Sequence, residues 1–166
     1  MELLLIRHGD AIDDAPGLGD AGRWLSGRGR IATRRVASFL VANESRRPIE
    51  IWTSPLVRAV QTAEIVAEAA RLTDRVIVLD ALGTHGSVGT VAAALQRQRP
   101  AGPVALVGHE PGLSVLALRL LGDVPWSGFS KSSVLAVAWP GEGVASFRWV
   151  LDPHTMTTID TLEELR

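Results

Sequence analysis

Short apolar runs alternate along this chain with longer segments of helical period, and this alternation constrains the fold more than any other feature. The runs that predict buried strands cover residues 3–6, 49–53, 76–79 and 104–107. Parallel strands need a crossover of a dozen or more residues, which is usually a helix. The alternation therefore predicts an α/β fold of three layers, in which helices cover both faces of a largely parallel sheet.

The segments between these runs predict the helices. Ser26 is a typical N-cap, and Ser54-Pro55 has the residues expected at the N-cap and first position of a second helix that runs to about Arg71. Further helices are expected near 88–97 and from about 111 to 121. The apolar face of the first helix is predicted to consist of Ile31, Ala32, Val36, Phe39 and Leu40.

The last third of the chain changes character. Residues 134–139 and 145–150 flank a Pro-Gly-Glu-Gly turn and predict a β-hairpin. Its antiparallel strands would join one side of the sheet and make the sheet mixed.

Length and charge limit the partners. A chain of 166 residues with 46% hydrophobic residues fits one domain with a sizeable core. A net charge of −1 gives no global basic field for nucleic acid or an anionic membrane. The absence of cysteine excludes a thiol nucleophile and a thiolate metal site. With neither a signal peptide nor a span of ~20 apolar residues, we expect a cytoplasmic protein.

Basic side chains follow three of the predicted strands. They are Arg7-His8-Gly9 after the first strand, Ser54-Pro55 with Arg58 after the second, and Gly108-His109 after the fourth. Ligands of open α/β sheets bind beyond the carboxyl ends of the strands, so these side chains are expected to surround one ligand.

The residue types favour a phosphoryl group as that ligand. The guanidinium fork of arginine matches phosphate oxygens, and Arg58 lies near a helix N-terminus, which also attracts anions. Neutral imidazole is a competent nucleophile near pH 7, and the neighbouring guanidinium charges should keep His8 neutral. A single Arg or His at a strand end is usually a surface or capping residue, but the joint pattern favours a phosphatase.

These residues resemble the motifs of the histidine phosphatase superfamily, also called phosphoglycerate mutase-like. Arg7-His8-Gly9 is similar to its signature tripeptide, the segment 53–63 to its second motif, and Gly108-His109 to its third. The segment 25–29 also matches the start of the family's first helix, so the resemblance covers nearly the whole chain. It implies one domain over residues 1–166, without a cap insertion, a metal or a cofactor.

The resemblance also implies a role for each site residue. His8 is expected to be phosphorylated transiently, and water is then expected to hydrolyse the phosphohistidine. Arg7, Arg58 and His109 are expected to bind the phosphoryl oxygens and to complete the catalytic set. The expected substrate contacts are Gly9, Ser54, Gly108, Arg7, Arg58 and His109.

The start Arg7-His8-Gly9-Asp10-Ala11 and the compact length resemble the SixA-type phosphohistidine phosphatases. Many superfamily members carry an acid in the loop after the third strand, where this chain has Ala81. A phosphoramidate leaving group needs less acid catalysis than an alkoxide, so the resemblance implies phosphohistidine as substrate. Candidate proton donors are Asp10, Asp13, Asp80 and His85, each of which is more often a solvated loop residue.

Only 51 positions separate Arg58 from His109, which leaves no room for a lid. An open cleft would admit a phosphorylated protein, such as a His-containing phosphotransfer domain. Two alternatives stay open. The chain could be a phosphomonoesterase acting on a small or nucleotide-linked phosphate, or a weakly active module that binds phosphorylated proteins.

Two further motifs are set aside. The string Gly17-Leu18-Gly19-Asp20-Ala21-Gly22 matches a dinucleotide fingerprint, but it lies too far past the first strand, and a flexible loop is the better interpretation. In a SixA-like fold, the resemblance implies that this loop borders the active site, with Arg23 or Arg28 near the substrate. His109-Glu110-Pro111-Gly112-Leu113 begins like a zinc-protease motif but lacks the second histidine.

Overall fold

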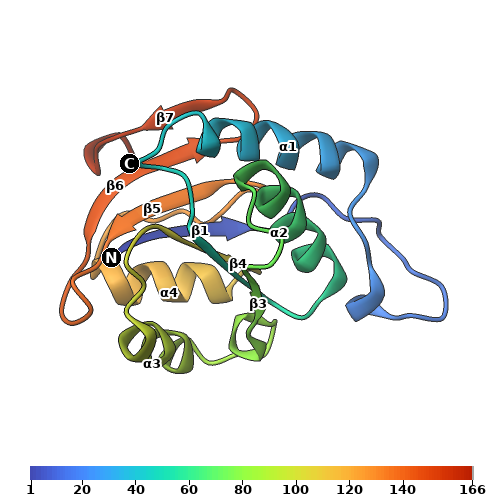
Figure 1. The fold of residues 1–166 in the computed structure, drawn as a ribbon, viewed down its shortest axis with the longest axis horizontal. Helices are drawn as coiled ribbons and strands as arrows, with labels where there is room; N and C mark the ends of the chain where they lie inside the picture. Colours follow the sequence, from blue (N-terminus) through green and yellow to red (C-terminus); the bar gives the residue numbers. More distant parts are fainter. Residues whose placement is uncertain (166) are drawn as a thin grey trace.

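A seven-stranded sheet lies between two helical layers in the computed structural model, which describes residues 1–165 (Figure 1). The strand order is β3-β2-β4-β1-β5-β6-β7. The parallel strands are β1 (Glu2–Arg7), β2 (Glu50–Thr53), β3 (Val76–Val78) and β4 (Val104–Gly108). The antiparallel strands are β5 (Val134–Ala138), β6 (Ser146–Asp152) and β7 (Thr157–Ile159).

Two helices pack on each face of the sheet. Helices α1 (Gly27–Val41) and α2 (Val57–Ala70) cover one face, and α3 (Val88–Gln98) and α4 (Gly112–Leu121) cover the other (Figure 1). Short 3₁₀ turns lie at Asp20–Gly22, Asp80–Leu82 and Glu163–Leu165. In the part of the chain that the structure describes, no helix is long and apolar enough to cross a membrane.

The central strand β1 is buried on both faces, as its continuous apolar run predicts. Leu3 and Leu5 pack in the core under α3 and α4, whereas Leu4 and Ile6 pack in the core under α1 and α2. The register pairs Arg7 with Gly108. The ends of β1 and β4 therefore lie at the same level, which places His8 beside His109.

The predicted fold class is confirmed, including the terminal hairpin that makes the sheet mixed. The short strand β7 was not predicted, because three residues of mixed polarity give no periodic signal.

Two details of the helices were predicted wrongly. The N-cap of α2 is Leu56 and its first residue is Val57. Ser54 lies two residues before the cap, and its hydroxyl accepts from Leu56 N (3.2 Å) and bonds the His109 ring (2.8 Å). On α1, Ile31 is 62% exposed, so it does not belong to the buried face. Gly29 faces Asp10, where a Cβ would lie 2.0 Å from the carbonyl oxygen, and Ile31, two residues later, lies on the opposite side of the helix.

Candidate active site

His8 and His109 stand side by side just beyond the ends of β1 and β4. The backbone N–H of His8 donates to the Gly108 carbonyl (3.1 Å), which continues the ladder by one residue. The two ring centroids lie 4.9 Å apart, and both side chains are buried. Strand pairing thus holds the two imidazoles in fixed proximity.

Hydrogen bonds determine which nitrogen of His8 carries the proton. Nδ1 lies 2.7 Å from the Gly9 carbonyl oxygen, which can only accept, so Nδ1 is the donor. Nε2 is then the unprotonated nitrogen, and it accepts from Arg58 Nε at 3.3 Å. The lone pair of Nε2 is therefore directed at the guanidinium of Arg58.

Both imidazoles are neutral near pH 7. The pKa of His8 is lowered to about 4, mainly by burial; the charges of Arg58, Arg7 and Lys131 act in the same direction, and the Gly9 hydrogen bond opposes them. Burial, with the neighbouring His8 and Arg58, lowers the pKa of His109 to about 3. The arginine charges act in the predicted direction, but burial is the larger cause.

Arg58 is held by the loop between β1 and α1. It lies in the first turn of α2 and is 4% exposed. Its Nη1 donates to the backbone oxygen of Asp20 (2.8 Å), and Nη2 forms an ion pair with the Asp20 carboxylate (3.0 Å). The positive end of the helix dipole adds to the guanidinium charge at this point.

Arg7, the last residue of β1, is held from the opposite side. Its Nη1 donates to the backbone oxygen of Phe129 (2.6 Å). The N–H of Phe129 donates to the Glu110 carboxylate (2.6 Å), which also accepts from the backbone and the hydroxyl of Ser114. Glu110, which follows His109 in sequence, thus positions Phe129, and the Phe129 carbonyl positions Arg7.

Arg7, His8, Arg58 and His109 are here called the cluster. Two of its buried nitrogen atoms have no hydrogen-bond partner among the described residues: Arg7 Nε and His109 Nδ1. The other ring nitrogen of His109, Nε2, lies 2.8 Å from the Ser54 hydroxyl, which can donate to it while accepting from Leu56 N. In that tautomer, Nδ1 of neutral His109 carries the proton. Buried donors without partners are costly, so this cluster is suited to an anion that accepts from both.

The sequence and the fold match known proteins. The family model described as histidine phosphatase superfamily (branch 1) matches residues 3–83. Phosphohistidine phosphatase SixA of Escherichia coli (strain K12) is 32% identical over 157 residues, which cover 92% of this chain and 94% of that protein. The chain belongs to the histidine phosphatase superfamily.

Two further relatives extend this comparison. A solved structure of the protein histidine phosphatase SixA with tungstate matches with a TM-score of 0.86 at 30% identity, covering 95% of this chain and 100% of that one. An uncharacterized protein of a Picosynechococcus strain is 42% identical over 116 residues, 68% of either chain. The matches to the SixA proteins support a phosphatase.

Gly9, the third residue of the superfamily tripeptide, has a steric role. A Cβ at this position would lie 2.6 Å from the Thr33 hydroxyl and 3.1 Å from the Gly29 carbonyl oxygen. Its N–H donates to the Thr62 hydroxyl, which in turn donates to the Arg58 carbonyl. Gly9 therefore lets α1 and α2 close against the loop that carries His8.

The candidate proton donors do not join the cluster. Asp10 is held by Lys131 (2.6 Å) and Ser26 (2.7 Å), which lower the pKa of its carboxyl. Asp13, Asp80 and His85 are exposed, and none has a hydrogen bond to a residue of the cluster within the described part of the chain. In the same part, no three His, Cys, Asp or Glu side chains are grouped for a metal ion.

The loop between β1 and α1 does border the site, as predicted, but through a different residue. Arg23 pairs with Asp20 (2.9 Å), and the side chain of Arg28 is 91% exposed. Asp20 was missed because its only signal is an acid in a glycine-rich loop. Glu110 was missed because its partner, Phe129, lies 19 residues away in an irregular segment.

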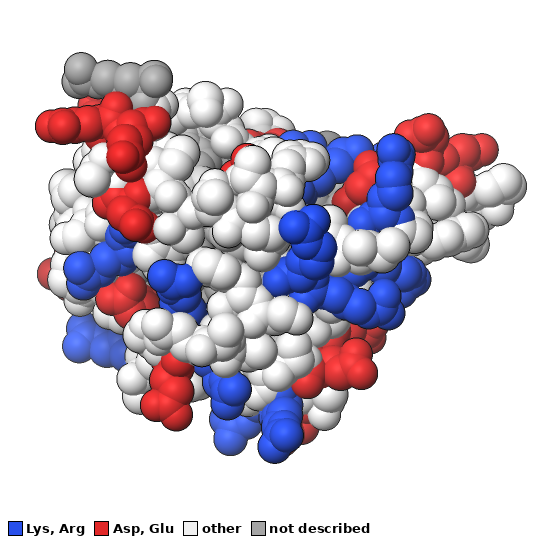
Figure 2. Space-filling view, turned by 90° about the horizontal axis from the view of Figure 1, so that it is seen from above, with Lys and Arg blue, Asp and Glu red and all other residues white. Residues whose placement is uncertain are grey.

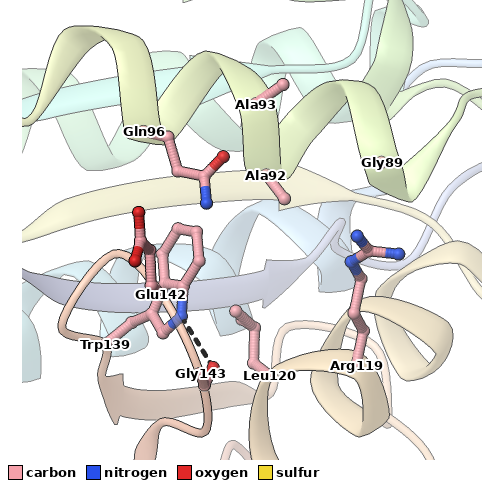
Figure 3. A pocket seen from close by; sticks show the side chains of 9 residues that line it. All are labelled: Gly89, Ala92, Ala93, Gln96, Arg119, Leu120, Trp139, Glu142 and Gly143. Atoms are coloured by element: carbon pink, nitrogen blue, oxygen red, sulfur yellow. Dashed lines mark hydrogen bonds between the residues drawn. The ribbon is translucent and has the colours of Figure 1, made fainter.

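A separate groove of about 520 Å³ lies on the other face of the sheet (Figure 3). Gln96 of α3, with Trp139 and Glu142 after β5, lies at one end, and Arg119 of α4 lies at the other. The indole N–H of Trp139 donates to the Gly143 carbonyl (3.2 Å). None of the side chains of the histidine cluster lines this groove, so its size does not make it the catalytic site.

Proposed function

We propose that this chain hydrolyses phosphohistidine in proteins, with the phosphoryl group carried transiently on Nε2 of His8. The observation that carries the proposal is the orientation of that ring. Nδ1 is bonded to the Gly9 carbonyl, Nε2 is unprotonated, and the lone pair points to the guanidinium that would bind the phosphoryl oxygens. Burial keeps this nucleophile neutral across the physiological pH range.

The reaction takes two displacements at phosphorus. Nε2 of His8 attacks the phosphorus while the bond to the imidazole nitrogen of the substrate breaks, and that nitrogen keeps the electron pair and takes a proton from solvent. Water then attacks the phosphorus of phospho-His8, and the electron pair of the N–P bond returns to Nε2. The protons of the water pass to the phosphate product and to solvent.

The surrounding donors supply electrostatic stabilisation. Arg7 Nε and His109 Nδ1 are buried without partners among residues 1–165, and with the His109 proton on Nδ1 an oxyanion on His8 would accept from both. Arg58 contributes its charge beside Nε2. These side chains would stabilise the transition state of phosphoryl transfer mostly through their positions and charges.

Two observations favour phosphohistidine over phosphate esters. Within the described residues, Asp20 is the only acid whose carboxylate bonds a side chain of Arg7, His8, Arg58 or His109, and it is engaged in an ion pair with Arg58. A leaving imidazole needs less acid catalysis than an alkoxide. The relatives named SixA are called phosphohistidine phosphatase and protein histidine phosphatase, and one binds tungstate, a tetrahedral oxyanion.

A substrate panel tests the proposal. We expect kcat/KM for a phosphohistidine peptide and for phosphoramidate to exceed that for simple phosphate esters by ~100-fold or more. Equal kcat/KM for esters would support the phosphomonoesterase alternative. Binding of the phosphopeptide without any turnover would indicate a binding module. His8→Asn, verified by circular dichroism to be folded, provides the inactive control.

A further inference from the structure

The charge pattern of helix α1 is unusual for a helix. It carries four arginines, Arg28, Arg30, Arg34 and Arg35, and no acidic residue. Cations near a helix N-terminus oppose the dipole, and like charges at i and i+4, such as Arg30 and Arg34, repel. These choices disfavour the helix locally, and residues that break local rules tend to serve function.

The arginines fall on two flanks of α1. Arg34 faces α2, because it lines a surface groove together with Ile65 and Glu68 of that helix. Arg28 lines a different groove of about 490 Å³ with Ala32, Lys131 and His154. Arg35 follows Arg28 by two turns, so the two lie on the same flank, ~10 Å apart along the axis.

This second groove adjoins the catalytic cluster. Its lining includes Asp10, two residues after His8, and Ser132, whose N–H donates to the Arg7 carbonyl at 3.2 Å and to the His8 carbonyl at 3.3 Å. The charge of Lys131 also contributes to lowering the pKa of His8. A ligand in the groove would therefore reach the rim of the phosphoryl site.

The acids near the groove are already engaged. Asp10 accepts from Lys131 and Ser26, and Asp152 accepts from the backbone of His154 (2.8 Å) and from Thr155 (3.1 Å). Arg28 and Lys131 both form ion pairs with Asp10, at 3.7 and 2.6 Å, so two cations share one carboxylate, and Arg35 forms no ion pair within residues 1–165. Seen from above, Lys and Arg side chains gather beside the projecting part of the molecule, with Asp and Glu side chains next to them (Figure 2).

We propose that Arg28, Arg35 and Lys131, here called the basic strip, bind acidic side chains of the protein substrate next to its phosphorylated histidine. The proposal rests on the proposed function, which places a phosphorylated protein at the adjoining cluster. Charge complementarity favours an acidic peptide surface, and the strip continues from the catalytic rim along α1. The net charge of the whole chain is −1, so the attraction for an acidic peptide would come from this local basic surface and not from the overall charge.

Two peptides of equal length test the strip. Both carry one phosphohistidine, flanked in one peptide by four glutamates and in the other by four glutamines. We expect wild-type kcat/KM to be about tenfold higher for the glutamate peptide at low salt, since charge acts mainly on association. In the double variant Arg28→Glu/Arg35→Glu this ratio should fall to about one. Glutamate at position 28, in the first turn, suits the helix dipole, and position 35 is exposed, so the variant should stay folded.

Arg97→Glu/Arg119→Glu is the matched control, because it makes the same charge change on α3 and α4, which cover the other face of the sheet. It should keep the tenfold ratio. A ratio near one in the wild type, or an equal loss in the control, would overturn the proposal. So would an equal fall in kcat/KM for phosphoramidate and the glutamate peptide in Arg28→Glu/Arg35→Glu.

A binding measurement separates this proposal from the proposed function. If no phosphorylated compound is turned over, the proposed function fails, but the strip is still tested by fluorescence anisotropy with the unphosphorylated glutamate peptide. Stronger binding than that of the glutamine peptide, lost in the Arg28→Glu/Arg35→Glu variant, supports the strip. Stronger binding of a single-stranded oligonucleotide of equal charge would assign the strip to nucleic acid and overturn it.

Discussion

Arg7 and Arg58 flank the same imidazole, but they are held by two different parts of the molecule. Arg7 bonds the carbonyl of Phe129, a residue 4% exposed, and Glu110 fixes that residue from behind. Arg58 bonds Asp20, whose side chain is 58% exposed in the loop between β1 and α1. One half of the site is thus fixed within the protein, and the other half is held by a contact that water can replace.

This difference indicates how the site accepts an anion. The carboxylate of Glu110 forms no ion pair with either arginine among the described residues, so it orders Arg7 without neutralising it. The carboxylate of Asp20 pairs directly with Arg58, so an incoming phosphoryl group must share or displace that contact. The first acid should therefore aid anion binding, and the second should oppose it.

The largest expected effect is the loss of a guanidinium on the fixed side. Arg7→Ala removes a buried donor that, in the proposed mechanism, binds the oxyanion, and loss of one such donor typically lowers the rate by ~10²–10³-fold. We expect kcat/KM for phosphoramidate to fall by about that factor, measured by phosphate release. A fall of less than about fivefold would mean that Arg7 serves only the fold.

The pH dependence of stability tests the burial of the two imidazoles. An unfolded histidine has a pKa of 6.5, whereas burial lowers the pKa of folded His8 to about 4, so the unfolded chain binds more protons between these values. Acid therefore destabilises the fold as the pH falls from about 6.5 to about 4, by up to ~3 kcal/mol for His8. Urea titrations across this range measure the loss, and His8→Asn should reduce the slope. An unchanged slope in that variant would contradict the buried, neutral imidazole.

The next effect is expected from Glu110→Ala, which leaves the N–H of Phe129 unsatisfied and frees the residue that holds Arg7. We expect the inhibition constant of tungstate to rise about tenfold and stability to fall by ~1–3 kcal/mol. Glu110→Gln should recover part of both, because its amide oxygen still accepts. Stability loss with an unchanged inhibition constant would show that Glu110 does not position Arg7.

The smallest expected effect is that of Asp20→Asn, with the opposite sign. Removing the negative charge weakens the side-chain contact of Arg58, although its bond to the Asp20 backbone oxygen stays. Tungstate inhibition should therefore strengthen a few-fold, while the loss of an exposed ion pair changes stability by less than ~1 kcal/mol. Parallel inhibition curves for Asp20→Asn and Glu110→Ala give the comparison directly. Weaker inhibition in both variants would contradict the contrast between the two halves.

The sequence predicted the half of the site that depends on strands. Arg7, His8 and His109 follow continuous apolar runs, and the parallel register of β1 and β4 then brings them together without further information. Asp20 and Glu110 could not be predicted in this way. Their contacts depend on how two irregular segments fold back over the sheet, which no hydrophobic period records.

Ser54 and Ile31 show the same limit for the helices. Ser54 has the residue type of an N-cap, but its hydroxyl bonds the imidazole of His109, and the helix starts later. Ile31 fits an apolar spacing, yet the packing of Gly29 against Asp10 turns it outward. Tertiary contacts decided both positions against the local pattern.

The central claim is that Nε2 of His8 carries the phosphoryl group. The most direct measurement is rapid quenching of the enzyme with phosphoramidate in base, followed by mass spectrometry and ³¹P NMR of the trapped protein. We predict one acid-labile phosphoryl group on Nε2 of His8, absent from His8→Asn. A phosphoryl group on another residue, or turnover by His8→Asn, would contradict the account.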